Sequence, residues 1–110
     1  MAYINTAEMT NRSIKLLVTK SPDLAEKALA RAEMDTRLCA RTFEVLTEDI
    51  LLDDNDYLAS EMLYTYCEYM FTYRLIDAVK GAFELDDNYT RLAYEAKADA
   101  QNIKNELSKS

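Results

Sequence analysis

The residue types that carry most enzyme and metal chemistry are nearly absent from this chain. It has no histidine, the commonest general base and a frequent zinc ligand. Its two cysteines, Cys39 and Cys67, lie far apart and form no CxxC pair, so we interpret both as buried thiols in a reducing compartment. One glycine cannot supply a phosphate-binding loop. We therefore expect no catalytic residue, no metal, no cofactor and no enzyme activity.

One acidic run, Asp53-Asp54-Asn55-Asp56, superficially resembles a calcium-binding loop. It lacks the glycine and the later bidentate glutamate of such loops, so helix capping and solvation are the favoured roles. Asp53, Asp54 and Asp56 are also candidate protein-contact residues, because they belong to a wider acidic surface. That surface is either solvated or a docking patch for a basic partner, and the sequence leaves both open.

The net charge of −7 is unevenly distributed along the chain. Residues 1–41 carry +2, residues 42–88 carry −10 and residues 89–110 carry +1. A strongly negative centre disfavours binding to a phosphate backbone, which needs clustered cations to displace counterions. We expect no specific nucleic-acid binding, and basic protein surfaces are more natural partners.

Tyrosine is abundant, with eight residues and no tryptophan. Tyr64, Tyr69 and Tyr73 fall within one short stretch, and tyrosine suits both the edge of a core and a protein interface. We take these three as candidate contacts, with packing in the core as the equal alternative. Phe83 and Leu85 follow, and they either pack onto the core or project into a neighbouring molecule.

The elements that must position these residues are predicted to be helices. One glycine and one proline are too few for the tight turns of a sheet protein. Ser21-Pro22-Asp23 is a strong start signal, and Asn5 with Glu8 forms a capping box at an earlier start. Gly81 is expected to close a helix in the left-handed conformation, and Asp86 or Asp87 to cap the last one.

We therefore predict an all-α fold, a small bundle of about four helices in a single domain over residues 1–110. The expected segments are about 5–24, containing a short helix that ends near Thr19, then 22–50, 56–80 and 87–107. Small and large apolar residues recur every three or four positions along the second and last helices. The third helix is apolar around more of its circumference than one neighbour requires, so we expect it at the centre.

No stretch of the chain reads as a secretory signal or as a membrane span. We expect a protein made in the cytoplasm.

The order of these features resembles the head-tail connector (neck adaptor) proteins of tailed bacteriophages. The resemblance covers nearly the whole chain and rests on helix order and length. It is carried by the opening Met1 to Ile4, the Ser21 to Leu24 helix start, and apolar residues of the three long helices. These residues are Ala28, Leu29, Ala32, Tyr57, Ala59, Leu63, Tyr66, Tyr73, Ala96, Ala100 and Ile103.

The resemblance implies a structural protein that forms a ring with copies of itself beneath the portal protein. Such a ring contacts the next neck or tail component and helps to build the DNA channel, which places the protein in the virion neck. Tyr3 and Ile4 join the candidate contacts on this basis. Many relatives have a glycine and an arginine-rich turn after the second helix, where this chain has Leu51-Leu52-Asp53-Asp54, so the resemblance is weakest there.

Two other functions compete with the connector hypothesis. An acidic helical inhibitor would imitate DNA on a basic enzyme surface, but here the carboxylates cluster at expected helix ends, as capping requires. A regulatory interaction module, monomeric or dimeric, would bind a basic partner outside any virion. Oligomeric mass distinguishes the last possibility from a ring.

Overall fold

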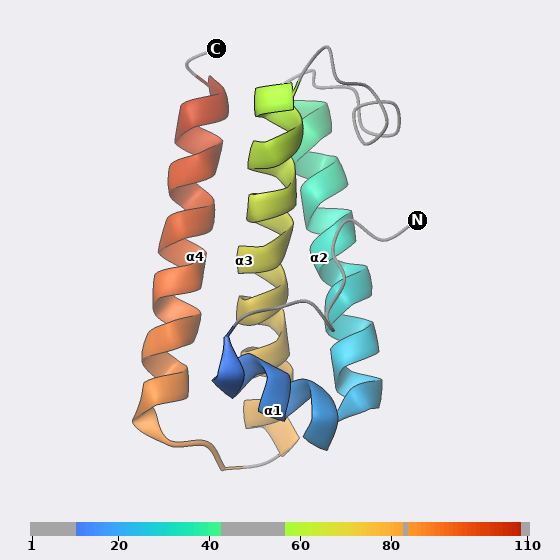
Figure 1. Ribbon diagram of the computed structural model, residues 1–110, viewed down its shortest axis with the longest axis vertical. Helices are drawn as coiled ribbons and strands as arrows, with labels where there is room; N and C mark the ends of the chain where they lie inside the picture. The colour runs from blue at the N-terminus through green and yellow to red at the C-terminus, as the bar shows by residue number, and fades with distance from the viewer. Residues whose placement is uncertain (1–10, 43–56, 83, 109–110) are drawn as a thin grey trace.

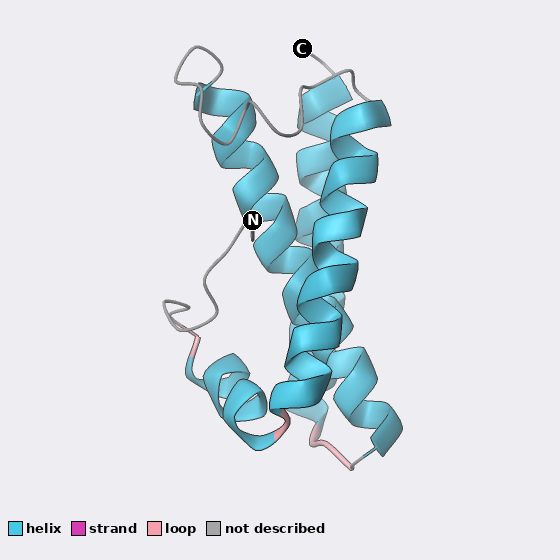
Figure 2. Cartoon of the chain, turned by 90° about the vertical axis from the view of Figure 1, so that its right-hand side faces the viewer, coloured by secondary structure: helices cyan, strands magenta, loops and turns pink. Residues whose placement is uncertain are grey.

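The computed structural model describes residues 11–42, 57–82 and 84–108. These residues form the helices α1 (Arg12–Lys20), α2 (Pro22–Thr42), α3 (Tyr57–Ala82) and α4 (Asp87–Ser108). Figure 2 shows that the described part of the chain is helical apart from short connections, with no strand in it. The all-α bundle predicted from the sequence is confirmed.

The first two helices begin at local signals in the sequence. The side chain of Asn11 accepts a hydrogen bond from the backbone N–H of Ile14 at 3.2 Å, and α1 starts directly after it. The predicted capping box of Asn5 and Glu8 lies outside the described residues. Pro22 is the first residue of α2, as its fixed φ predicts.

The junction between α3 and α4 is only partly as expected. The side chain of Asp86 accepts a hydrogen bond from the N–H of Asn88 at 2.9 Å, which confirms the predicted cap of α4. Gly81, by contrast, lies inside α3, which ends at Ala82, and its φ is not positive. The predicted left-handed closure was wrong, because a glycine in a helix costs only about 1 kcal/mol and does not force an end.

Three long helices lie side by side with α3 between α2 and α4, and α1 crosses one end of the bundle (Figure 1). Helix α3 packs against each of the other three, which confirms its expected central place. None of the described helices is long and apolar enough to cross a membrane.

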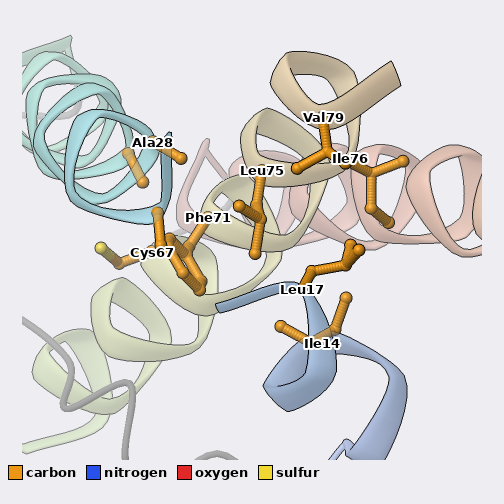
Figure 3. Close-up of a cluster of buried hydrophobic side chains, with 10 residues drawn as sticks. Ile14, Leu17, Ala28, Cys67, Phe71, Leu75, Ile76 and Val79 are labelled. Carbon is orange, nitrogen blue, oxygen red and sulfur yellow. The ribbon is translucent and has the colours of Figure 1, made fainter. Parts of the chain in front are cut away.

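The larger core cluster joins α1, α2 and α3. Figure 3 shows Ile14 and Leu17 of α1 pointing toward Leu75 and Ile76 of α3. The predicted small-residue face of α2 is buried here, and so are α3 residues that the sequence analysis did not place in the core. The buried members are Ile14, Leu17, Ala25, Ala28, Ala32, Cys67, Phe71, Leu75, Ile76 and Val79.

A smaller cluster fills the other end of the bundle. It joins α2, α3 and α4 through Cys39, Leu63, Tyr66, Ala100 and Leu107. The apolar residues that recur every three or four positions along the last helix are therefore confirmed as its inner face, with Ala96, Ala100 and Leu107 buried. The expected continuation of α2 to Ile50, with Phe43 and Leu46, lies outside the described residues, as does Asp56 at the predicted start of α3.

Candidate protein-contact site

An open cleft of about 200 Å³ lies between α3 and α4, next to the start of α1. It has three carboxylates, and its apolar surface comes from a tyrosine ring, a leucine and an alanine. We call it the acidic cleft, and its lining residues are Asn11, Glu68, Tyr69, Thr72, Leu92, Glu95, Ala96 and Asp99.

Helix periodicity places these residues on one side of the bundle. Glu95 and Asp99 are four residues apart, so they lie on one face of α4 about 6 Å apart along its axis. Ala96 is buried, and its small side chain lets α4 approach α3 closely. Leu92 and Tyr69 are half-buried and keep part of their apolar surface open to the cleft.

The cleft has a negative character. None of its described lining residues is a lysine or an arginine. The nearest compensating contact is Arg91 to Glu95 at 3.8 Å, between side chains that are 71% and 58% exposed. Such an exposed pair contributes little, so the carboxylates remain available to a cationic partner.

The described residues of the cleft do not form an arrangement typical of a catalytic or metal site. The Thr72 hydroxyl donates a hydrogen bond to the carbonyl of Glu68 within its own helix, at 3.0 Å. Among the described residues, no group of three or more His, Cys, Asp or Glu is placed to hold a metal. The arrangement fits attraction of positive charge and apolar contact, which are properties of a binding surface.

No protein-family model, curated protein or solved structure matches this chain.

A second notable surface lies on the outer side of α2. Four exposed residues on the helix face away from the buried alanines are spaced at intervals of four, three and four positions, so they form one stripe. These residues are Lys27, Arg31, Met34 and Leu38. We call it the α2 stripe. Met34 is 62% exposed and Leu38 is 53% exposed, although both are large apolar residues. The sequence analysis missed this stripe, whose signal was large apolar residues on the face away from the alanines.

The candidate contact residues predicted from the sequence have varied positions. Tyr64 and Leu85 are half-buried and pack against the larger core cluster. Tyr69 packs against the smaller cluster and lines the acidic cleft. The ring of Tyr73 lies 5.1 Å from the ammonium of Lys97 and 5.8 Å from the guanidinium of Arg74. The remaining candidates, Tyr3, Ile4, Asp53, Asp54, Asp56 and Phe83, lie outside the described residues.

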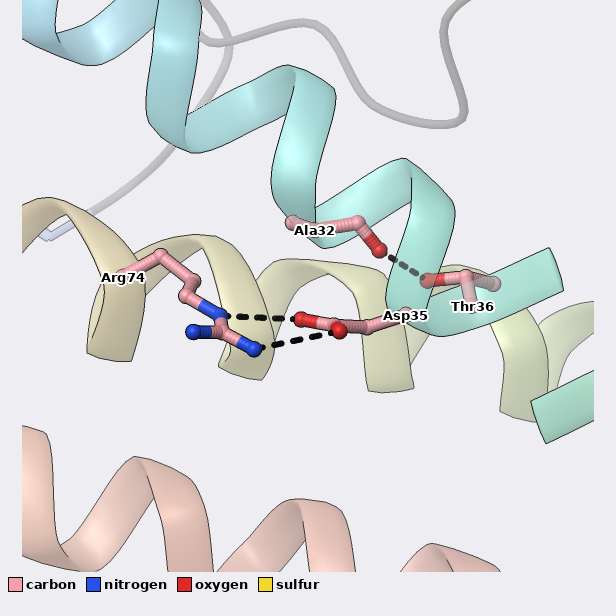
Figure 4. A network of polar contacts seen from close by, with 4 residues as sticks. All are labelled: Ala32, Asp35, Thr36 and Arg74. Carbon is pink, nitrogen blue, oxygen red and sulfur yellow. Dashed lines mark hydrogen bonds and ion pairs between the residues drawn. The ribbon is translucent and has the colours of Figure 1, made fainter. Parts of the chain in front are cut away.

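A polar contact fixes α2 against α3. Arg74 donates hydrogen bonds to both carboxylate oxygens of Asp35, at 3.0 and 3.2 Å (Figure 4). The hydrogen bond to Asp35 raises the pKa of Arg74, so this guanidinium stays charged. Beside it, the buried Thr36 hydroxyl donates to the carbonyl of Ala32 at 2.7 Å. The Asp35–Arg74 contact holds α2 and α3 in register, whereas the Thr36 hydrogen bond lies within α2.

Both cysteines are free and buried, as predicted. Burial raises the pKa of Cys67 to about 11, and a hydrogen bond with Thr36 opposes this shift. Burial likewise raises the pKa of Cys39, and nearby Lys104 opposes the shift. Both thiols therefore stay protonated near neutral pH, where only a thiolate would be nucleophilic.

Proposed function

We propose that this protein is a structural component that works through protein–protein contact. In its specific form, it is a head-tail connector subunit of a tailed bacteriophage. It forms a ring with copies of itself beneath the portal protein, contacts the next neck or tail component and helps to build the DNA channel of the neck. It performs no catalysis and uses no cofactor.

The observation that carries the proposal is the presence of two different candidate contact surfaces on one small chain. The acidic cleft lies between α3 and α4, and the α2 stripe lies on the outer side of α2. Figure 1 shows α2 and α4 on opposite sides of α3. A subunit that is contacted on two different sides can join neighbours into a closed ring, which a single surface cannot do.

The virion part of the proposal rests on the resemblance in helix order. A short helix followed by three long ones is the order on which the resemblance rests. The acidic character of the chain suits a DNA channel, since negative walls limit adhesion of passing DNA.

Imitation of DNA by an acidic face is less well supported. A mimic needs carboxylates in an uninterrupted row, whereas on α4 acidic and basic residues are interspersed. Arg91, Glu95, Lys97, Asp99 and Lys104 all lie on this one helix. Such mixed charge is typical of a helix that meets another protein or solvent.

Light scattering on mixtures with a panel of phage portal proteins tests the proposal. We expect a mass that corresponds to several copies of the chain on each portal ring. An unrelated basic protein of similar size serves as control: it should bind as well as a portal if only net charge matters, and weakly if the contact is specific. A monomer or dimer that ignores every portal would contradict the connector function and favour a regulatory module.

A further inference from the structure

We infer that the α2 stripe of one copy docks on the acidic cleft of a second copy. This inference rests on the proposed ring and names the two surfaces that would meet in it. It is argued from charge, spacing and exposed apolar area of the described residues.

Charge complementarity is the first reason. The α2 stripe begins with the exposed cations Lys27 and Arg31, whereas the cleft contains Glu68, Glu95 and Asp99. More broadly, α1 and α2 carry seven Lys or Arg and four Asp or Glu, while α3 and α4 carry five and seven. The two sides of the molecule therefore attract each other between copies, and like sides repel.

The spacing of the charges matches as well. Figure 1 shows that α2 and α4 both start at the end of the bundle that α1 crosses, so they run in the same direction within one copy. When the bundle lies along the ring axis, α2 of one copy therefore runs parallel to α4 of the next. Lys27 and Arg31 are four residues apart, as are Glu95 and Asp99. Each interval spans about 6 Å of helix axis, so both cations can face a carboxylate at once.

Apolar contact completes the match. Met34 lies one turn beyond Arg31 and is 62% exposed. Ile103 lies one turn beyond Asp99 on α4 and is half-buried, with part of its side chain accessible. In the parallel orientation Met34 falls beside Ile103, and the flexible methionine side chain adapts well to such an edge. The contact then has an apolar part flanked by ion pairs, as protein interfaces commonly do.

The two surfaces cannot meet within one copy. The α2 stripe faces away from the buried alanines that pack on α3, and the cleft is on the side of α3 that meets α4. The contact is therefore heterologous, and each copy has one stripe and one cleft to offer. Repetition of such a contact gives a ring if the rotation closes.

A pair of charge-reversal variants tests this inference on the full chain. K27E/R31E reverses the stripe, and E95K/D99K reverses the cleft. Sedimentation velocity over a concentration series measures self-association of the unchanged protein, each variant and their equimolar mixture. We expect the unchanged protein to associate, and each variant alone to need about tenfold higher concentration or more. We expect the mixture to recover association, because each reversed surface then meets its complement.

Matched controls separate this contact from a general effect of charge. R12E/K15E on α1 changes the net charge as much as K27E/R31E, and D77K/E84K as much as E95K/D99K, at exposed positions outside both surfaces. We expect the controls to associate like the unchanged protein. Circular dichroism of all variants verifies that each is folded.

Three outcomes would overturn the inference. In the first, the unchanged protein is a monomer at every concentration. In the second, both charge-reversal variants associate like the unchanged protein. In the third, the variants lose association and their mixture does not recover it. The proposed function fails separately, when no portal protein acquires added mass. A chain that binds portal and assembles regardless of the reversals would keep its function and lose this interface.

Discussion

At the residue scale, the contribution of a polar contact to the stability of the fold depends on how far the contact is buried. The carboxylate of Asp35 is 18% exposed and bound through both oxygens by Arg74, whereas that of Glu95 is 58% exposed and 3.8 Å from Arg91. A two-point contact shielded from water stabilises a fold more than a long contact at the surface.

Removing one charge from each pair measures this difference. We predict that D35N lowers the free energy of unfolding by about 1 kcal/mol, because Arg74 loses a charged partner in a partly buried place. The matched change E95Q should cost less than about 0.5 kcal/mol. Urea denaturation followed by circular dichroism gives both values, and equal losses would contradict the assigned role of the Asp35 contact.

The free energy of unfolding should fall at alkaline pH, because buried thiol and phenol groups keep their protons in the folded state. Burial raises the pKa of Cys67 from 9.0 to about 11 and that of Tyr66 from 10.0 to about 12, and it also raises the pKa of Cys39. The folded state therefore holds these protons more tightly than the unfolded state. The stabilisation is complete below about pH 9 and declines as the pH rises toward 12.

Urea denaturation under reducing conditions at pH 8 and pH 10.5 tests this expectation. We predict a lower free energy of unfolding at the higher pH, with Cys67 as a main contributor because it is the more strongly shifted thiol. C67A should be less stable at pH 8 but should lose less on going to pH 10.5. A stability that stays constant or rises over this interval would contradict the burial of these groups.

At the element scale, close helix packing depends on small residues. Ala32 of α2 is fully buried in the larger core cluster, whereas Ala30 of the same helix is exposed. We predict that A32L destabilises the protein by about 1–3 kcal/mol, because the larger side chain has no space between α2 and α3. A30L should leave stability nearly unchanged. Thermal unfolding of both variants tests this prediction, and similar unfolding midpoints for A32L and A30L would contradict the assigned packing.

Gly81 offers a test with the opposite sign. It lies within α3, without a positive φ, and a Cβ built there would meet nothing within 4 Å. We predict that G81A raises the free energy of unfolding by about 0.5 kcal/mol, because alanine restricts the unfolded chain and favours the helix. Destabilisation in a urea titration would mean that Gly81 adopts the left-handed conformation after all.

Helix starts were predictable from the sequence where the signal is local. Pro22 and Asp86 specify their helix starts through φ and a side-chain hydrogen bond, and neither needs a distant partner. Gly81 was misjudged because one glycine costs a helix too little to force its end, and α3 continues to Ala82. Leu75 and Ile76 were not placed in the core, since their burial depends on how α1 crosses the bundle, which no local pattern specifies.

At the scale of the whole molecule, the candidate site arises from juxtaposition. Tyr69 was a sequence candidate and lines the acidic cleft. Glu68, Glu95 and Asp99 line the same cleft, but they come together only because α3 packs against α4. The α2 stripe likewise stands out only when its exposure is known. Composition predicted a protein-contact function, and the acidic cleft and the α2 stripe are the surfaces through which we propose that it acts.

The most direct measurement is electron microscopy of the chain mixed with a panel of phage portal proteins. A structural neck component should add a ring of density at one end of a portal particle, with a central opening in line with the portal channel. The α2 stripe and the acidic cleft should then lie between adjacent copies. Portal particles that remain unchanged at saturating concentrations of the chain would contradict the proposed function.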